Sequence, residues 1–386
     1  MDRNSIIKKW SEASGKVSVA GIEDVNVREN LAILLENQET KNIKSELLNE
    51  DFTTSTPTSE ETGQFRPLAL ALVRRTFPEL FANKVLPVQA MNGPVGLAYA
   101  LRFIYATPSE GVADGNEAAF NLVDKYSGYT GSQSGTSGSA DSGTGVALDI
   151  AEAWKLGTQY PQLKLILAKT AVEAKTRKLG ASFSLEAAQD IRAMHGLDIE
   201  REILNVLQYE VTAEYDREVV ARLKAVAVDA TKGGAAADTV DISATDGRWS
   251  QERFGNLVNT IVKKANDIAI YTRRGAGNFV IVSPRVATAL QAAGHQFFTS
   301  LEAKVNATGT MAAIGTINGV IDVYRDSYAS SDYALVGYKG PGVSDGGVIY
   351  SPYITGLVAR ATDPNDFSPR IGVMSRYALT DSLLGA

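Results

Sequence analysis

The most regular hydrophobic pattern in the chain begins at Ile199 and continues to about Val228. Apolar side chains recur there at every fourth residue: Ile203, Leu207, Val211, Tyr215 and Val219. This spacing lines one face of an α-helix, and Asp198 is a suitable capping residue at its start. At 1.5 Å per residue the helix would be about 45 Å long. A helix of this length exceeds what a compact domain usually needs, so we expect it to act as a beam in an extended or flattened subunit.

Shorter patterns on both sides of this helix predict further helices and strands. Helices are expected at 67–80, from the capping residue Ser184 to about His195, at 250–273 and at 284–293. Strands are expected at 98–105, 163–169, 278–283, 320–324, 333–337, 348–350, 357–361 and 371–379. A mixture of helices and antiparallel strands predicts an α+β fold.

Two segments differ from this pattern because they contain little to bury. Residues 46–64 are rich in Glu, Thr and Ser, which is typical of a linker. This linker follows residues 27–38, whose pattern predicts a helix with Leu31, Leu34 and Leu35 on one face. Between 127 and 145, 12 of 19 residues are Gly or Ser, which predicts a flexible loop tip.

Composition narrows the classes of function that are open to the chain. Its 386 residues carry 38 Lys and Arg against 44 Asp and Glu, a formal charge of −6. Such a balance argues against dense contacts to nucleic-acid phosphates, which require clustered positive charge. No apolar run approaches the roughly 20 residues that span a bilayer. The first ten residues lack the apolar stretch of a secretory signal, so we expect no membrane partner and synthesis in a cytoplasm.

Catalytic chemistry has few candidate residues. The chain has no cysteine and two histidines, His195 and His295, so the usual nucleophiles, general bases and metal ligands are scarce. His195 lies near Asp190 and Asp198, but a cation at the end of a helix is favourable without any catalysis. The Gly275-x-Gly277 pair lacks the preceding strand and the third glycine of a dinucleotide site. We therefore predict no catalytic residue, no metal and no cofactor, and no enzymatic activity.

Ordered blocks from about residue 65 to 380 carry a resemblance to a known family. The blocks are LVRRTFPEL (72–80), VQAMNGPVGL (88–97), ALRFIY (100–105), VEAKTRKL (172–179), AAQDIRAMHGLD (187–198), RGAGNFV with SPR (274–285), LVGYKG (335–340), YSPY (350–353), DP (363–364) and PRIG (369–372). Together they closely resemble the major capsid proteins of T-even-type myoviruses, which are tailed bacteriophages. The family is longer and carries an inserted domain near the position of the Gly/Ser segment, so we expect that insert to be absent here.

The resemblance implies the Hong Kong 97-type capsid fold and a division of the chain into six parts. These are an N-terminal arm and linker (1–64), the start of the peripheral domain (65–105), an extended loop with the Gly/Ser tip (106–176), the spine helix and its connector (177–247), the axial domain (248–350) and the return strands of the peripheral domain (351–386). In this scheme the long helix would be the spine helix.

The resemblance also implies a function, which is to build a container. Copies of the chain would assemble into hexamers that tile an icosahedral or prolate head, with pentamers at the vertices as a further option. The head would enclose double-stranded DNA without sequence specificity, assemble in the host bacterial cytoplasm and remain in the virion. Vertex, portal, scaffold and decoration proteins of the same phage would be further partners. The alternatives are a paralogous pentameric vertex protein, a cellular encapsulin of the same fold, and a cytosolic enzyme.

Two kinds of site follow from the same comparison. Leu48-Asn49-Glu50 before Asp51 resembles the Leu/Ile-x-Glu pattern cut by the prohead protease of the family, so Glu50–Asp51 is a candidate cleavage site. Contacts between subunits are expected at Leu31, Leu34, Leu35, Arg74, Arg75, Gly131 and Gly135. Because an apolar helix face on a polar tether needs a partner, we expect the three leucines to dock on an adjacent subunit or on internal scaffold. The alternative is that the arm folds back on its own peripheral domain.

Overall fold

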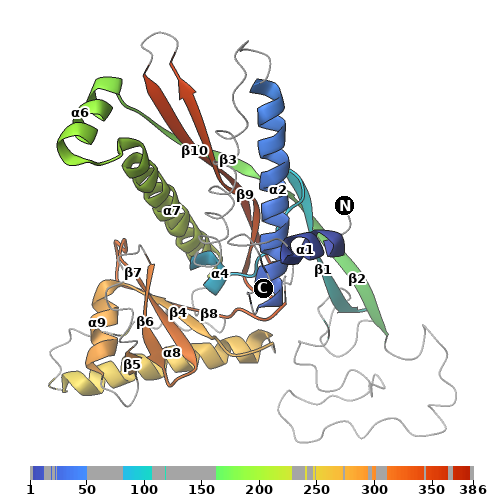
Figure 1. Cartoon of the computed structure of the whole chain (residues 1–386). Coiled ribbons are helices and arrows are strands. Elements are labelled where there is room, and N and C mark those ends of the chain that lie inside the picture. Colours follow the sequence, from blue (N-terminus) through green and yellow to red (C-terminus); the bar gives the residue numbers. More distant parts are fainter. Residues whose placement is uncertain are drawn as a thin grey trace, which may run out of the picture.

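The computed structural model describes the following residues: 3–12, 19, 22, 24–49, 81–106, 118, 162–227, 240, 247, 249–272, 274–293, 298–300, 311–342, 345–363 and 368–382. Figure 1 shows an elongated body with a long helix beside a sheet, a second sheet with its own helices at one end, and a projecting hairpin. The helix predicted at 67–80 and the Gly/Ser tip predicted at 127–145 lie outside the described residues.

The predicted long helix is present as α7 (Ile199–Val226), which has 28 residues. At 1.5 Å per residue it is about 42 Å long. The carboxylate of Asp198 caps it by accepting a hydrogen bond from the backbone N–H of Glu200 at 3.2 Å. It follows α6 (Leu185–His195), which is capped by Ser184 and ends at Gly196 with a φ of 67°. Both predicted helices and both predicted caps are confirmed.

A three-stranded antiparallel sheet lies against α7, in the order β3 (Lys175–Ser182), β10 (Pro369–Asp381), β9 (Val348–Thr362). Leu207 of α7 packs on Ile371 and Val373 of β10. The strands predicted at 348–350 and 357–361 are both present, but the break expected between them is wrong, because β9 runs through both ranges. Its register against β10 shifts twice, between Met374 and Tyr377, which accommodates Pro352 and Gly356.

The second sheet has five strands in the order β5 (Phe298–Ser300), β6 (Met311–Ile317), β7 (Ile321–Asp326), β4 (Phe279–Val282), β8 (Ala334–Gly337). Helices α8 (Ser250–Thr272) and α9 (Pro284–Ala292) pack on it through a separate apolar core. The expectation of purely antiparallel strands is wrong for one pair, since β4 and β7 are parallel. Helix α9 and strands β5 and β6 lie between β4 and β7 in the chain, and together they form the long connection that a parallel pair requires.

The hairpin consists of β1 (Val95–Tyr105) and β2 (Leu163–Glu173), which are antiparallel over their whole length. Both strands were predicted, although each is longer than expected. The chain continues from β2 into β3 through Ala174, so the hairpin extends from the edge of the three-stranded sheet (Figure 1). The hairpin therefore joins the three-stranded sheet at the end where β2 meets β3.

The N-terminal segment contributes α1 (Arg3–Glu12) and α2 (Val25–Asn49), and the short helix α4 (Phe81–Val85) follows later in the chain. The linker was predicted to start at residue 46, but α2 continues to Asn49 and so includes the first four residues of that segment. The main core joins distant parts of the chain: Ile6, Trp10, Leu31, Leu34, Leu35, Phe81, Leu86, Tyr215, Val219, Tyr350 and Tyr377.

Candidate assembly surfaces

One face of the β1–β2 hairpin is apolar and exposed. Side chains alternate between the two faces of a strand, and directly opposed residues share a face. Leu101 is opposite Leu167, and Phe103 is opposite Leu165. The apolar side chains of this face are between 49% and 63% exposed: Val95, Leu97, Tyr99, Leu101, Phe103, Leu163, Leu165 and Leu167. We call these eight residues the hairpin face.

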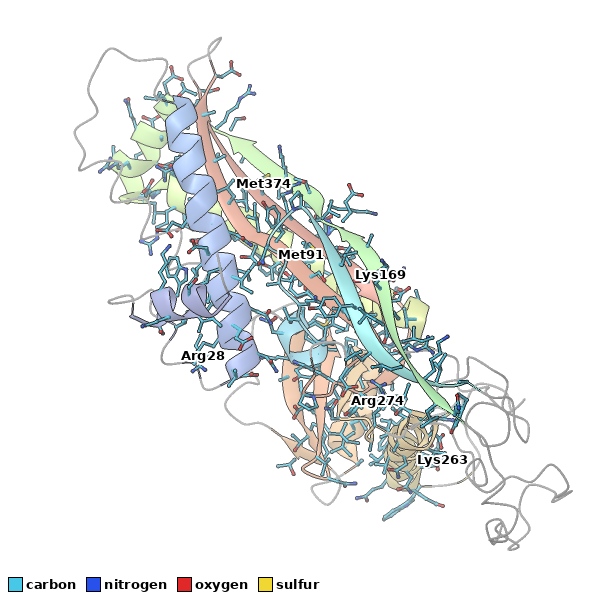
Figure 2. The ribbon with its side chains drawn as sticks, turned by 90° about the vertical axis from the view of Figure 1, so that its right-hand side faces the viewer. Arg28, Met91, Lys169, Lys263, Arg274 and Met374 are labelled. Carbon is cyan, nitrogen blue, oxygen red and sulfur yellow. The ribbon has the colours of Figure 1, made fainter. Side chains whose placement is uncertain are left out.

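The opposite face of the hairpin is tied to the rest of the subunit at its base. Ala98 and Val172 are buried in a small apolar core with Met91 and Tyr353. The backbone N–H of Ala174 donates to the carbonyl of Pro94 at 2.9 Å. In Figure 2, Met91 lies near the start of β1, and Lys169 marks the course of β2 away from that anchor. The hairpin is held rigidly at its base, while the apolar face remains uncovered.

Lys169, opposite Tyr99, and Glu173, opposite Val95, lie on the same face, so the apolar side chains are most concentrated around the Leu101–Leu167 and Phe103–Leu165 pairs. Exposed apolar side chains that are grouped in this way mark an interaction site, whereas single exposed apolar residues are ordinary. The members of the hairpin face come from two paired strands, so the backbone hydrogen bonds of the ladder fix their positions relative to one another. Such a face can be covered by another apolar surface and offers no chemistry beyond burial. The residue-by-residue alternation in 95–103 and 163–167 was visible in the sequence, but the sequence did not identify this face as a contact site.

The leucines proposed as contacts between subunits lie elsewhere, and this expectation is corrected. Leu31 and Leu35 are fully buried and Leu34 is 2% exposed. They pack in the main core of their own subunit, with Phe81, Tyr215 and Tyr350 among their cluster. Side chains already buried this way cannot also present a docking surface to a second copy. The arm folds back on its own subunit, as in the alternative weighed from the sequence.

Side-chain amides of α2 bind the backbone of the segments beside it. Asn30 donates from Nδ2 to the carbonyl of Val88 at 3.0 Å and accepts from the N–H of Ala90 at 3.2 Å. Asn37 donates to the carbonyls of Met91, at 2.9 Å, and Tyr353, at 3.2 Å. Gln38 donates to the carbonyl of Gly356. The helix is therefore joined to β9 by polar contacts as well as by apolar packing.

Helix α1 packs across α2 and is held there by an acidic pair. Lys9 Nζ contacts Glu36 at 2.8 Å and Glu39 at 2.5 Å, and Trp10 Nε1 donates to Glu36 at 3.0 Å. Desolvation lowers the pKa of Lys9, but the hydrogen bonds to the two carboxylates outweigh it, and the pKa is raised overall. Ile6 and Trp10 are buried in the main core.

Aromatic rings make up the middle of this core. Tyr215 lies 4.8 Å from Tyr377 and 5.2 Å from Tyr350 between ring centroids. Burial, as the largest cause, raises the pKa of both Tyr215 and Tyr350. Tyr377 donates its hydroxyl to Glu218 at 2.6 Å, and Arg177 also binds that carboxylate. These tyrosines act as apolar packing with polar tips, since ionising them inside the core would be costly.

The five-stranded sheet is joined to the main core by a second set of contacts. Phe81 and Tyr324 meet edge to face at 5.3 Å, and burial followed by the charge of Asp322 raises the pKa of Tyr324 to about 12. Lys339 donates to the carbonyl of Asn83, and burial lowers the pKa of Lys339. Tyr333 donates to Asp326 at 2.6 Å, and burial and this bond raise the pKa of Tyr333. The contacts of Phe81 and Lys339 hold the sheet against α4, and Nζ of Lys224 in α7 lies 3.5 Å from the centroid of the Tyr333 ring.

The residues weighed for catalysis have structural roles in the described part of the chain. The Asp198 carboxylate caps α7, and His195 is exposed at the end of α6. A Cβ at Gly275 would lie 2.6 Å from the Tyr338 ring, and one at Gly277 would lie 2.9 Å from Val336. Close packing therefore accounts for both glycines. Among the described residues, no group of three or more His, Asp or Glu side chains is arranged to hold a metal ion.

The remaining predicted site residues fall outside the described residues: Glu50, Asp51, Arg74, Arg75, Gly131 and Gly135. Across the parts of the chain that the structure describes, no helix is both long and apolar enough to span a membrane.

Comparison with known proteins decides the family. The model of the major capsid protein Gp23 family matches residues 62–384. The chain belongs to this family. The resemblance inferred from the ordered sequence blocks is thereby confirmed.

Relatives at about 30% identity extend over most of the chain. The major capsid protein of Enterobacteria phage T4 is 30% identical over 400 residues, covering 83% of this chain and 76% of that protein. The major capsid protein of Serratia phage KSP90 is 30% identical over 403 residues, covering 97% of this chain and 87% of that protein. The capsid vertex protein of Escherichia phage AR1 is 27% identical and covers 53% of this chain. The coverage favours a major capsid protein over the vertex paralogue.

Solved structures of phage capsids are also similar, at low identity. The capsid of Myoviridae phage XM1 matches with a TM-score of 0.41 and 9% identity, covering 78% of this chain and 87% of that chain. A chain of Microbacterium phage Oxtober96 matches with a TM-score of 0.40 and 13% identity, covering 78% and 85%.

Proposed function

We propose that the major capsid chain forms hexameric capsomers, and that the hairpin face of each copy packs on the next copy around the ring. The observation that carries this proposal is the uncovered apolar face on a hairpin anchored at one end. Capsid proteins assemble through contacts between copies of the same chain. An apolar face that its own subunit leaves exposed is suited to such a contact.

The contact is of the head-to-tail kind, because the hairpin face meets a different surface of its neighbour. Such contacts form a closed ring when the rotation between copies closes. Each contact can be modest, since closure of a ring and then of a shell makes the later contacts intramolecular. The stability of the head would thereby come from many identical contacts between subunits, without covalent chemistry from this chain.

We further propose the Hong Kong 97-type arrangement for the parts of the subunit. Helix α7 would be the spine helix, β1 and β2 the stem of the extended loop at 106–176, and the five-stranded sheet with α8 and α9 the axial domain at 248–350. Strand β3 would lie at the start of the 177–247 segment, with α6 and α7 after it, and β9 and β10 would supply the return strands from 351 onward. The length of α7 and the separate core of the five-stranded sheet support this division.

The contents and other partners of the head follow from its role. A chain with a formal charge of −6 suits a wall around double-stranded DNA better than a protein that grips it. Vertex, portal, scaffold and decoration proteins would complete the particle in the host cytoplasm. Proteolysis between Glu50 and Asp51 is proposed as a maturation step, and α2 ends at Asn49, immediately before this site.

The proposal is tested by making the hairpin face polar. Leu97, Leu101 and Leu167 are each at least 56% exposed, so changing all three to Ser should leave the melting temperature of the monomer unchanged. Hexamers and shells should be lost in sedimentation and negative-stain electron microscopy. The matched control changes Val206 and Met194 to Ser, which are 60% and 77% exposed on α7 and α6. Full shell yield from the hairpin variant would contradict the proposal, as would equal loss in the control.

A further inference from the structure

Trp249 is the most exposed large apolar side chain in the described part of the chain, at 78%. Tryptophan is highly buried on average. Trp249 directly precedes α8, and its carbonyl accepts from the N–H groups of Glu252, at 3.1 Å, and Arg253, at 3.3 Å. This is the N-cap position, where Ser, Thr, Asp or Asn normally supplies a side-chain oxygen. An indole has no such oxygen, so helix formation does not explain a tryptophan here.

The chain around Trp249 holds the residue in one place. Two residues earlier, Gly247 has a φ of 78°, in the left-handed region that glycine adopts most readily. After it, α8 packs into the apolar core of the five-stranded sheet through Leu257, Val258 and Ile261. The indole is therefore a large apolar group with one N–H donor, carried at the end of an anchored helix. Residues of this kind supply a large share of the binding energy in protein interfaces.

The subunit presents Trp249 and the hairpin face on opposite sides. In Figure 1, α8 begins at Ser250 at the left edge of the molecule, and the hairpin projects on the right. In a ring of identical subunits, the right side of each copy faces the left side of the next. Head-to-tail contacts join two different surfaces in this way. The beginning of α8 is thus placed to meet the hairpin of an adjacent copy.

The two surfaces are also complementary in chemistry. The Leu101–Leu167 pair offers apolar side chains to an indole, and Lys169 is exposed on the same face, two residues along β2. On the other surface, Glu252 is exposed one helical turn after Trp249. Each surface therefore places one charge beside an apolar group, and the two charges are of opposite sign. Complementary charges of this kind favour one partner and one register over others.

We propose that Trp249 and Glu252 form the surface on which the hairpin face of the adjacent copy packs. The indole lies against the Leu101–Leu167 pair of that copy, and Glu252 lies beside its Lys169. This inference rests on the proposed function and names the receiving half of its contact. Because the anchor and the hairpin are on different sides of one chain, the contact has a direction, and a ring can close only with every copy turned the same way.

The first test removes the anchor. Trp249→Ala should leave the melting temperature of the monomer unchanged, because the side chain is exposed. The association constant of the subunits, from sedimentation velocity, should fall at least tenfold, and Trp249→Phe should restore part of it. The matched control is Ile270→Ala, at a position near the other end of α8 that is 55% exposed, and it should assemble normally.

The outcomes separate this inference from the proposed function. Normal assembly of Trp249→Ala, together with lost assembly of the triple serine variant of the hairpin face, would overturn the inference and leave the proposed function intact. Normal assembly of the triple serine variant would overturn both, because the hairpin face would then not be a contact.

An exchange of charges tests the pairing itself. Lys169→Glu and Glu252→Lys should each weaken assembly, because each places like charges side by side in every contact. Both changes in one chain should restore assembly, since each contact of the ring then carries the reversed pair. Losses that simply add in the double variant would show that the two residues do not meet. That result would overturn the inference even if the hairpin face is required for assembly.

Discussion

Helix α2 and the β1–β2 hairpin both carry apolar side chains, but the subunit buries those of α2 and leaves one face of the hairpin exposed. In both, the apolar side chains are regularly spaced. Leu34 of α2 is 2% exposed, whereas Leu101 of the hairpin is 62% exposed. The spacing of apolar residues shows that a face will be covered, but it does not say by which chain. What separates the two is the supply of partners, since Tyr350 and Tyr215 lie over α2, and the hairpin projects past the edge of its sheet.

The largest effect should come from exchanging the leucines of the arm for serine. Truncating a buried leucine costs about 2 to 5 kcal/mol, so three of them approach or exceed the 5 to 15 kcal/mol that stabilises a typical protein. We expect Leu31→Ser, Leu34→Ser and Leu35→Ser together to abolish the cooperative melting transition and the soluble yield. The triple serine variant of the hairpin face is the control and should melt as the unmodified subunit does. Similar melting temperatures of the two variants would contradict the claim that the α2 leucines are part of the core and the hairpin face is not.

A proline in α7 should have the next largest effect, because α7 packs against the core that holds α2. Leu207 lies in the interior of the helix and is 6% exposed. Proline there removes a backbone hydrogen bond and clashes with the preceding turn, which costs about 3 kcal/mol or more. Leu207→Pro should therefore prevent folding or assembly, as followed by circular dichroism and shell yield. Val206→Ala, at the adjacent exposed position, should change stability by less than about 0.5 kcal/mol, and shells from the proline variant at normal yield would contradict the role given to α7.

High pH should destabilise the main core through its buried tyrosines. Burial raises the pKa of Tyr324 from 10.0 to about 12 and also raises the pKa of Tyr215 and Tyr350. The unfolded chain releases these protons at lower pH than the folded chain does, so this contribution to stability is complete below about pH 10 and falls as the pH rises toward 12. Tyrosinate absorbance should therefore rise together with the loss of helical circular dichroism. Ionisation of all tyrosines well before unfolding would contradict this account.

The smallest expected effects are the losses of stability when an amide of α2 or a surface ion pair is removed, and the amide should matter more. Asn37→Ala removes two hydrogen bonds to partly buried carbonyls, which should cost about 1 to 3 kcal/mol. Arg222→Ala removes a two-pronged contact to Asp381, but both side chains are about half exposed, so we expect at most about 1 kcal/mol. Denaturant midpoints of the two variants give the comparison. A larger loss of stability in Arg222→Ala than in Asn37→Ala would show that the amide contacts contribute little to the stability of the subunit.

Local signals predicted the helices well and the longer strand pairings less well. Ser184 and Asp198 both cap the helices that they were expected to cap, because an N-cap depends on the residues next to it. The strands predicted at 348–350 and 357–361 left Pro352 and Gly356 outside any strand, yet β9 continues through them, because β10, Met91 and α2 supply hydrogen bonds from distant parts of the chain. Strands β3, β5 and β6 were missed. Lys175–Ser182 is mostly polar and small, and its strand character comes from pairing with β10.

For the candidate surfaces too, local sequence patterns predicted the elements but not which of their faces are buried. The resemblance to capsid proteins identified the family, and the strands of the hairpin were visible as segments. The face of Leu97 and Leu101 became a candidate site only when the structure left it uncovered. For Leu31 the sequence showed an apolar helix and a tether, which fit a partner in either the same or another subunit. That choice depends on the shape of the core, which no local pattern contains.

The order in which the ribosome makes this chain has a consequence for its biosynthesis. Asn37 and its acceptor Tyr353 are 316 residues apart, and Gln38 and Gly356 are 318 apart. At 5 to 20 residues per second, α2 leaves the ribosome roughly 15 to 60 s before β9 is made. Throughout that interval its leucines have none of their later strand partners, and the nascent chain is open to aggregation. The subunit therefore completes its core only near the end of translation, and truncated chains that lack β9 should be insoluble even though most of the sequence is present.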